Sequence, residues 1–296
     1  TQGYSSAASD VYKRQAFTVA GAICALLILL LSACGIFHAK YIKTTSYDVI
    51  INKTIPERTS MKVVLLADTH FGYNAGVLHA RELVRKINKQ KPDLVCIAGD
   101  IFDNEYDAIR NPEKLEKTLR GIKSTYGVYA CWGNHDLNEE ILAGFTFKHK
   151  DGDLSDIKDP RMKKFLEDSN IHILEDESVL INDQFYVIGR KDASLTEKIH
   201  ETRKAPAQLT EKLNRDKPII MIDHQPKELQ ELADAGVDLD LCGHTHNGQT
   251  FPGNFTIKLM WENPCGLLSK DNMTNITTSG AGVWGPAMRI LSLIHI

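Results

Sequence analysis

The stretch Met61–His70, MKVVLLADTH, joins a short apolar run to an aspartate and a histidine. The run Met61–Ala67 is rich in Val and Leu and is typical of a buried strand. Asp68 and His70 come directly after it, where such a strand would end. In α/β domains the carboxyl ends of parallel strands face the ligand site, so this stretch predicts an α/β domain with polar chemistry at one sheet edge.

The same order of segments recurs along the chain, because short apolar runs alternate with segments of helical spacing. Strands are predicted at 94–98, 126–131, 171–174, 179–181, 185–188, 219–222 and 239–242. Helices are predicted at 77–88, 112–122, 161–168 and 226–235. The polar segment 143–159 is predicted to be a surface loop. Strands that alternate with helices support an α/β domain.

Carboxylate, amide and imidazole side chains follow five of these strands. Besides Asp68-Thr69-His70, the sets are Gly99-Asp100, Gly133-Asn134-His135-Asp136, Asp223-His224 and Gly243-His244-Thr245-His246. Glycine is expected in the last motifs because it lets the backbone turn sharply after a strand. A single histidine is more often structural than a ligand, so the ordered set carries the argument. Such donors suit divalent Mn, Fe or Zn, and paired metals ~3.5–4 Å apart serve phosphoryl transfer.

This ordered set resembles the calcineurin-like metallophosphoesterase family, and similar sequence continues to Arg289. The text GHTHNGQTFPGN at 243–254 and SGAGVWGPAMR at 279–289 resembles a bacterial membrane-anchored branch of that family. The resemblance implies a four-layer α/β/β/α sandwich of two mixed sheets flanked by helices. The phosphoesterase domain is expected at residues 61–290, preceded by a linker and first strand at 38–60.

The resemblance also implies two groups of metal ligands that share one carboxylate. The first metal would be held by Asp68, His70 and His246, the second by Asn134, His224 and His244, and Asp100 would bridge both. His135 would be the general acid or phosphate stabiliser, and Asp136 would orient its imidazole. The implied nucleophile is a hydroxide between the two metals, which attacks phosphorus in line.

At three positions the sequence differs from other branches of the family, which argues against membership in those branches. Asp103 stands where purple acid phosphatases have a metal-binding tyrosine, so no purple Fe(III) centre is expected. Asn104-Glu105 replaces the Arg-Gly of Ser/Thr protein phosphatases. His135 replaces an arginine of the soluble pyrophosphatase of the lipid A pathway.

The expected function is hydrolysis of a phosphate ester or pyrophosphate by a membrane-anchored enzyme. The branch is associated with lipid-linked substrates of the UDP-diacylglucosamine type. This expectation comes from the resemblance to the family and not from particular residues. A nuclease or nucleotide phosphodiesterase with the same metals, and a metal-binding scaffold without turnover, are the alternatives. The net charge of -3 gives no reason to expect a nucleic-acid partner. The oligomeric state stays open.

The segment Ala16–Phe37 carries no charged residue and is long enough to cross a bilayer. It is expected to be a single-pass membrane anchor or a signal segment. The run Leu31-Ser32-Ala33-Cys34 also resembles a lipoprotein signal, in which Cys34 would be acylated. The family suggests an extracytoplasmic domain, whereas the unpaired cysteines beyond the segment favour a reducing compartment.

Both ends of the chain resemble translated text of a sequencing adapter. SSAASDVYKRQ at 5–15 and LSLIHI at 291–296 would be the two ends of one adapter. On this reading residues 1–15 and 291–296 are not part of the natural protein, and the domain is truncated at its C-terminus.

Overall fold

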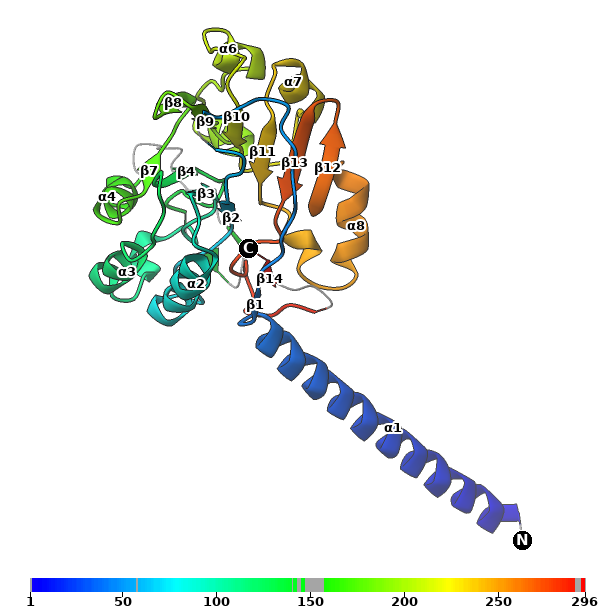
Figure 1. The fold of residues 1–296 in the computed structure, drawn as a ribbon. Coiled ribbons are helices and arrows are strands. Elements are labelled where there is room, and N and C mark those ends of the chain that lie inside the picture. The colour runs from blue at the N-terminus through cyan, green and yellow to red at the C-terminus, as the bar shows by residue number, and fades with distance from the viewer. Residues whose placement is uncertain are drawn as a thin grey trace.

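Two β-sheets lie face to face at the centre of the structure (Figure 1), a computed structural model that describes residues 2–56, 58–139, 141–142, 145–146, 157–290 and 294–295. The smaller sheet has the order β2-β3-β4-β7, from β2 (Val63–Leu66), β3 (Leu94–Ala98), β4 (Val128–Cys131) and β7 (His172–Ile173). Its described strands all pair in parallel.

The larger sheet has six strands in the order β12-β13-β11-β10-β9-β8. They are β8 (Glu177–Ile181), β9 (Phe185–Gly189), β10 (Ile219–Ile222), β11 (Leu239–Cys242), β12 (Gly266–Lys270) and β13 (Met273–Thr277). The inner strands are parallel, and an antiparallel partner closes each edge. The expected two-sheet α/β fold is confirmed, with the correction that only this larger sheet is mixed.

Alternation along the strands divides the core into three apolar layers. In β3, Val95 and Ile97 face the helices α2 (Val77–Gln90), α3 (Pro112–Leu119) and α4 (Pro160–Asp168). The alternate residues, among them Cys96, pack between the sheets against β10 and β11. On the far side, the larger sheet is covered by α6 (Pro206–Thr210) and α7 (Leu229–Asp234). Because side chains alternate across a strand, these layers make the order α/β/β/α.

Several short elements complete the fold. They are α5 (Ala193–Lys198), α8 (Gly253–Met260), the 3₁₀ turns η1 (Tyr106–Ala108) and η2 (His246–Gly248), and the strand pairs β1 (Ile42–Lys43) with β14 (Ile294–His295) and β5 (Ile141–Leu142) with β6 (Phe145–Thr146). Most of the predicted loop at 143–159 lies outside the described residues. Helix α7 starts at Leu229 and not at the predicted Pro226, because Glu228 before it has φ 56°, outside the helical region.

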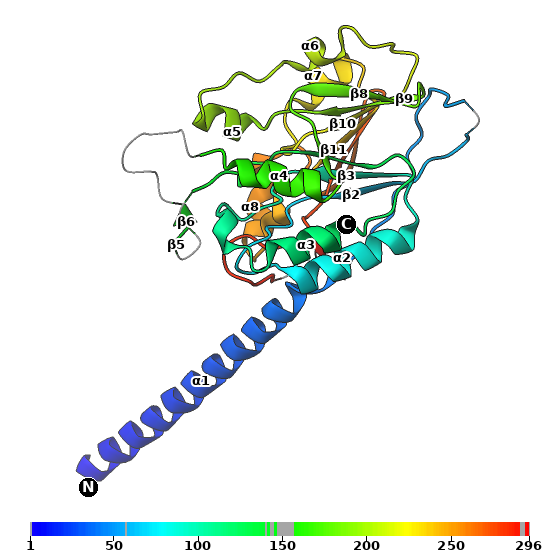
Figure 2. The same ribbon diagram turned by 90° about the vertical axis from the view of Figure 1, so that its left-hand side faces the viewer.

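A long apolar helix, α1 (Gln2–His38), projects from the domain (Figure 2). The most apolar 18-residue stretch within Asp10–His38 has a mean hydropathy of 2.6, and only 6% of that stretch is buried. By length and composition this helix can cross a membrane. Its last turn is joined to the domain, because the Gly35 carbonyl accepts a hydrogen bond of 3.0 Å from the Arg289 amide. A side chain at Gly35 would lie 2.5 Å from Met288 Cγ, so the junction is closely packed.

A fully buried aspartate lies in the middle of the larger sheet. Asp240 on β11 accepts a hydrogen bond of 2.7 Å from Asn275 Nδ2, and Cys242 Sγ lies 3.3 Å from the same oxygen. Burial, with the neighbouring charge of Asp223, raises the pKa of Asp240 to about 7. The unfolded chain therefore loses this proton at a lower pH than the folded chain does.

The pKa of Asp240 predicts a pH-dependent loss of stability. Above the ordinary pKa of 3.8 and up to about 7, only the folded state keeps the proton, so the free energy of unfolding falls as pH rises. Asp240→Asn cannot ionise, and its melting temperature should fall less than that of the wild type between about pH 5 and about pH 8. The exposed Asp216→Asn is the control and should keep the wild-type difference. Equal pH dependence in all three proteins would contradict this account.

Candidate metal centre

The predicted site residues meet at one end of the two sheets, where strands from both sheets stop. Asp68 and Asp100 follow β2 and β3 of the smaller sheet, and Asn134 and His135 follow β4. From the larger sheet, His224 follows β10, and the motif Gly243–His246 follows β11. The carboxyl ends of parallel strands therefore supply donors from two facing sheets, whereas the sequence pattern predicted a single sheet edge.

The first cluster consists of Asp68, His70 and His246. One donor atom from each lies within 4.8 Å of the others, and all three side chains are buried. The Nε2 atoms of His70 and His246 are 3.1 Å apart. Two ring nitrogens and a carboxylate that converge at this distance form a donor set for a divalent cation.

The second cluster consists of Asp100, His224 and His244, again with donor atoms within 4.8 Å of one another. His244 Nδ1 lies 3.1 Å from His224 Nε2. Asn134 Oδ1 also lies 3.1 Å from His224 Nε2, which brings the amide of Asn134 to this cluster.

Asp100 connects the two clusters. Its Oδ2 lies 3.2 Å from His224 Nε2 and 3.9 Å from His70 Nε2. Its Oδ1 accepts a hydrogen bond of 2.8 Å from the His135 amide. The carboxylate is thus held by the backbone on one side, and its other oxygen faces one histidine from each cluster.

Much of the site has a strained backbone. The φ angles are 53° at Asp68, 45° at His70, 49° at Asp100, 72° at His244 and 48° at His246. Each lies in the left-handed region, which costs a residue other than glycine roughly 1–3 kcal/mol and is found mainly at functional sites.

The glycine of Gly133-Asn134-His135-Asp136 has a role other than the expected sharp turn. A Cβ atom on Gly133 would lie 2.2 Å from Asp100 Oδ1, so glycine is required for the close approach of the two strand ends. The left-handed angles are instead adopted by the candidate ligands.

The charges of the site fit bound cations. Burial raises the pKa of Asp68 to about 6, although neighbouring imidazoles oppose this effect. Burial also opposes ionisation of Asp100, but the nearby His224 and His135 hold its pKa well below the usual range. Burial lowers the pKa of His244 to about 3, which leaves a neutral ring with a free lone pair. Buried carboxylates and imidazoles are stable when they are paired or coordinate a metal, so the residues present fit two divalent ions.

Asp136 was expected to orient the imidazole of His135, but the structure places its carboxylate against other groups. Its carboxylate accepts hydrogen bonds from the amides of Phe102 (2.8 Å) and Gly133 (2.7 Å). The partner of His135 Nδ1 is Asn104, whose Oδ1 lies 2.6 Å away. Asp136 therefore fixes the loops on either side of the site, and Asn104 orients the imidazole.

Two further residues were not found by the sequence reasoning. The buried Arg289 donates to the carbonyls of Ser279 (2.7 Å) and Gly282 (2.8 Å), and its Nη2 lies 3.0 Å from His246 Nδ1. Behind His224, Asp223 is paired with Arg190 at 3.1 Å. Arg190 stands beside no site motif, and Arg289 ends the branch motif at 279–289 without a role having been expected for it, so only the fold reveals their contacts.

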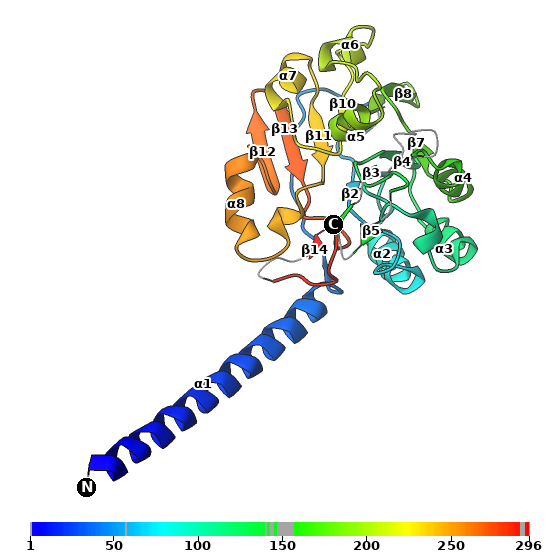
Figure 3. The same ribbon diagram turned by 180° about the vertical axis from the view of Figure 1, so that it is seen from behind.

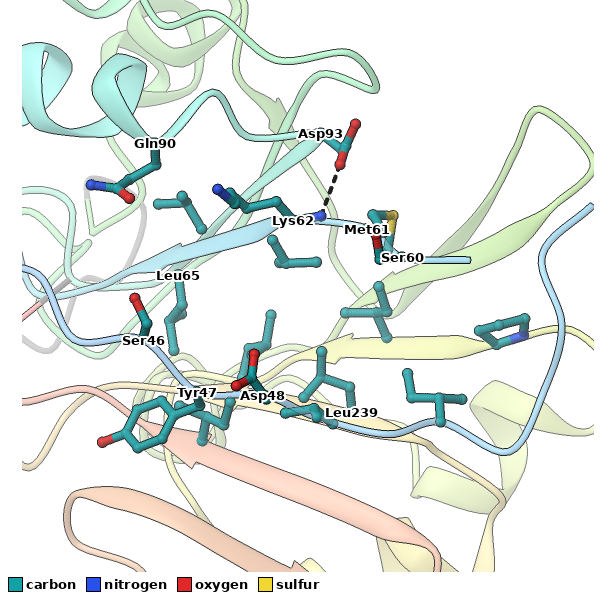
Figure 4. Close-up of a pocket in the computed structure, with 18 of the residues that line it drawn as sticks. Ser46, Tyr47, Asp48, Ser60, Met61, Lys62, Leu65, Gln90, Asp93 and Leu239 are labelled. Atoms are coloured by element: carbon teal, nitrogen blue, oxygen red, sulfur yellow. Dashed lines mark hydrogen bonds between the residues drawn. The ribbon is translucent and has the colours of Figure 1, made fainter. Parts of the chain in front are cut away.

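A cavity of about 940 Å³ lies away from this centre, beneath the segment 44–55 (Figure 4). Its lining includes Tyr47, Leu65 and Leu239, and the Lys62 amide donates to Asp93 at its rim. No candidate metal ligand is among its lining residues. The chemistry of the site is therefore not in this cavity.

The comparison with protein families agrees with this geometry. A family model described as calcineurin-like phosphoesterase matches residues 61–248, a range that contains every candidate ligand. The chain belongs to the calcineurin-like phosphoesterase family. This is a family of metal-dependent phosphohydrolases that typically bind two divalent metals.

Three relatives illustrate the range of similarity. A metallophosphoesterase of Campylobacter jejuni is 32% identical over 79% of this chain and 57% of its own length. A transmembrane protein with a metallophosphoesterase domain from Bos taurus is 26% identical over 98% of this chain and 64% of its own. The UDP-2,3-diacylglucosamine pyrophosphatase LpxG of Chlamydia trachomatis is 22% identical over 67% and 68%. The chain thus spans less than two thirds of the first two relatives.

The contact between Asn104 and His135 predicts a positioning effect. Asn104 has φ 63°, so Asn104→Gly removes the side chain without backbone strain. It should lower kcat by ~10–100-fold, less than the ~10²–10⁴-fold contribution of a general acid, and leave the metal content unchanged. Asn104→Asp should restore much of kcat and move the alkaline limb of the pH profile to higher pH, because a carboxylate favours the protonated ring. Unchanged kcat in Asn104→Gly would remove Asn104 from the mechanism.

Proposed function

We propose that this chain is a membrane-anchored two-metal phosphohydrolase whose substrate carries a phosphate ester or pyrophosphate on a lipid. The observation that carries the proposal is the position of the Asp100 carboxylate between the two donor clusters. Asp68, His70 and His246 would hold one ion, and Asn134, His224 and His244 the other, with Asp100 shared. When bound, two such ions lower the pKa of water and neutralise charge on phosphate oxygens.

His135 is proposed as the group that supplies a proton to the leaving oxygen. Its ring centroid lies 5.3 Å from that of His70, so it stands at the edge of the metal clusters. The hydrogen bond to Asn104 holds Nδ1 and leaves Nε2 for the substrate. Burial lowers the pKa of the His135 ring to about 4, so the negative charge of a bound phosphate would have to raise it for the ring to act as general acid.

The surroundings of the site support a substrate with an apolar part. The half-exposed Trp284 lies 6.0 Å from the His135 ring, and Trp261 lies 5.0 Å from the His244 ring. Lys227 Nζ stands 5.3 Å from the Trp261 ring, where its charge favours an anionic group. The similarity to LpxG supports the same class of substrate.

Membrane anchoring by α1 is part of the proposal. It is supported by the length and apolar character of α1 and by the similarity to the transmembrane protein of Bos taurus. Manganese, iron or zinc is proposed from the mixed carboxylate and imidazole donors, and an extracytoplasmic domain is proposed from the family.

Asp100 and His135 should separate metal binding from turnover. Asp100→Asn should lower the bound metal and reduce activity by more than the ~10–100-fold typical of losing an outer-shell partner. His135→Ala should keep both metals, because its backbone amide still donates to Asp100, and should lose ~10²–10⁴-fold in kcat. Metal analysis and kinetics of both variants make the test, with the exposed Asp107→Asn as control. Full metal content in Asp100→Asn would overturn the bridging assignment, and metal loss in His135→Ala would make His135 a ligand.

A substrate panel tests the proposed substrate class. Full-length chain loaded with manganese would be assayed on UDP-2,3-diacylglucosamine, a cyclic nucleotide, single-stranded DNA and bis-p-nitrophenyl phosphate, with Asp100→Asn as the blank. We expect the highest kcat/KM on the lipid. A preference for the nucleotide or DNA would favour a phosphodiesterase or nuclease, and no turnover of any compound would favour a scaffold.

A further inference from the structure

Helix α8 presents an exposed apolar stripe beside the metal centre. Phe255 and Leu259 lie on α8 and are 60% and 89% exposed, and Phe251, which precedes the helix, is 54% exposed. The rings of Phe251 and Phe255 pack edge to face with centroids 5.9 Å apart. No residue of α8 is buried, so its apolar side chains do not serve the core. A contiguous apolar surface of this kind on a soluble domain marks a binding surface.

The base of α1 is connected to this surface. The Gly35 carbonyl of α1 accepts from the Arg289 amide, and the next residue, Ile290, exchanges backbone hydrogen bonds of 3.2 Å with Gln249 and Phe251. Figures 1 and 3 show α8 at the lower part of the domain, toward the side from which α1 leaves, whereas α6 lies at the opposite end. The stripe is therefore linked to the end of α1 through Arg289 and Ile290, which make backbone hydrogen bonds to Gly35 and Phe251.

The charges of this segment also favour a bilayer surface. Between Asp240 and Glu262 the sequence has no acidic residue, and Lys258 is the one Lys or Arg there. Lysine can extend its charged end to lipid headgroups while its stem lies along apolar groups. An exposed apolar face that carries Phe and Leu, with a basic residue beside it, is a feature of helices that lie in the membrane interface.

We propose that α8 docks into the headgroup region of the same bilayer that α1 crosses, with the stripe of Phe251, Phe255 and Leu259 inserted. This inference rests on the proposed anchoring by α1 and goes beyond it. Helix α8 begins directly against the metal-binding loop, because a Cβ atom on Gly248 would lie 2.3 Å from the Gly253 backbone. At the other end of α8, Trp261 stands beside His244. A docked α8 thus brings the metal centre to the membrane surface, where a lipid headgroup can reach it.

Quenching of tryptophan fluorescence by brominated lipid tests the docking. Full-length Phe255→Trp and Leu259→Trp would be reconstituted in nanodiscs of phosphatidylcholine brominated near the headgroup end or near the methyl end of the acyl chain. The emission gained over the unsubstituted chain, which has three tryptophans of its own, should be quenched most by the bromines near the headgroup. Leu180→Trp on β8, at the far edge of the larger sheet, should not be quenched.

A second variant separates failure of docking from failure of anchoring. Leu27→Trp lies inside the apolar segment of α1 and should be quenched most by the bromines near the methyl end. If Leu27→Trp is quenched and both α8 variants are not, the docking proposal is overturned, and light scattering in detergent then shows whether a second copy covers α8. If Leu27→Trp is not quenched, anchoring by α1 is wrong, and the docking proposal falls with it.

Discussion

The site depends on how one carboxylate, that of Asp100, is held in a buried position. Backbone hydrogen bonding from His135 fixes one oxygen, and the other faces a histidine from each cluster. An ionised carboxylate is costly to bury unless charge or hydrogen bonds compensate it. The two sheets must therefore end at the same place, so that donors from both surround this group. Within the smaller sheet, the missing side chain at Gly133 lets the loop after β4 lie directly against Asp100 after β3.

The strained backbone follows from the same requirement. Five candidate ligands have positive φ angles, which regular strands and helices never require of them. Such angles persist only where the surrounding structure determines them strongly. Here the apolar layers on both sides of the sheets supply that support, and the strain is concentrated where strands end and ligands begin.

The sequence was sufficient for the order of the main elements and for the residues that gather at the site. Strand β3 was predicted with its observed bounds, because its apolar run is flanked by a proline and a glycine. The sequence did not reveal β12, at the edge of the larger sheet, or β13 beside it, because both mix polar and apolar residues. Nor did it reveal the partner of His135, because Asn104 belongs to the loop after another strand. Contacts between loops that are far apart in sequence leave no local pattern to find.

The packed joint between α1 and the domain has a mechanical consequence. A flexible linker between a membrane helix and its domain would allow the domain to swivel. Here the Gly35 carbonyl is hydrogen-bonded to the Arg289 amide, and the guanidinium of Arg289 contacts the ring of His246. A rotation of α1 about its axis would therefore change the orientation of the end of the domain that carries the candidate metal ligands. In the proposed arrangement the enzyme searches for substrate by lateral diffusion in two dimensions, at a fixed height and tilt, so that each encounter begins with the substrate already aligned.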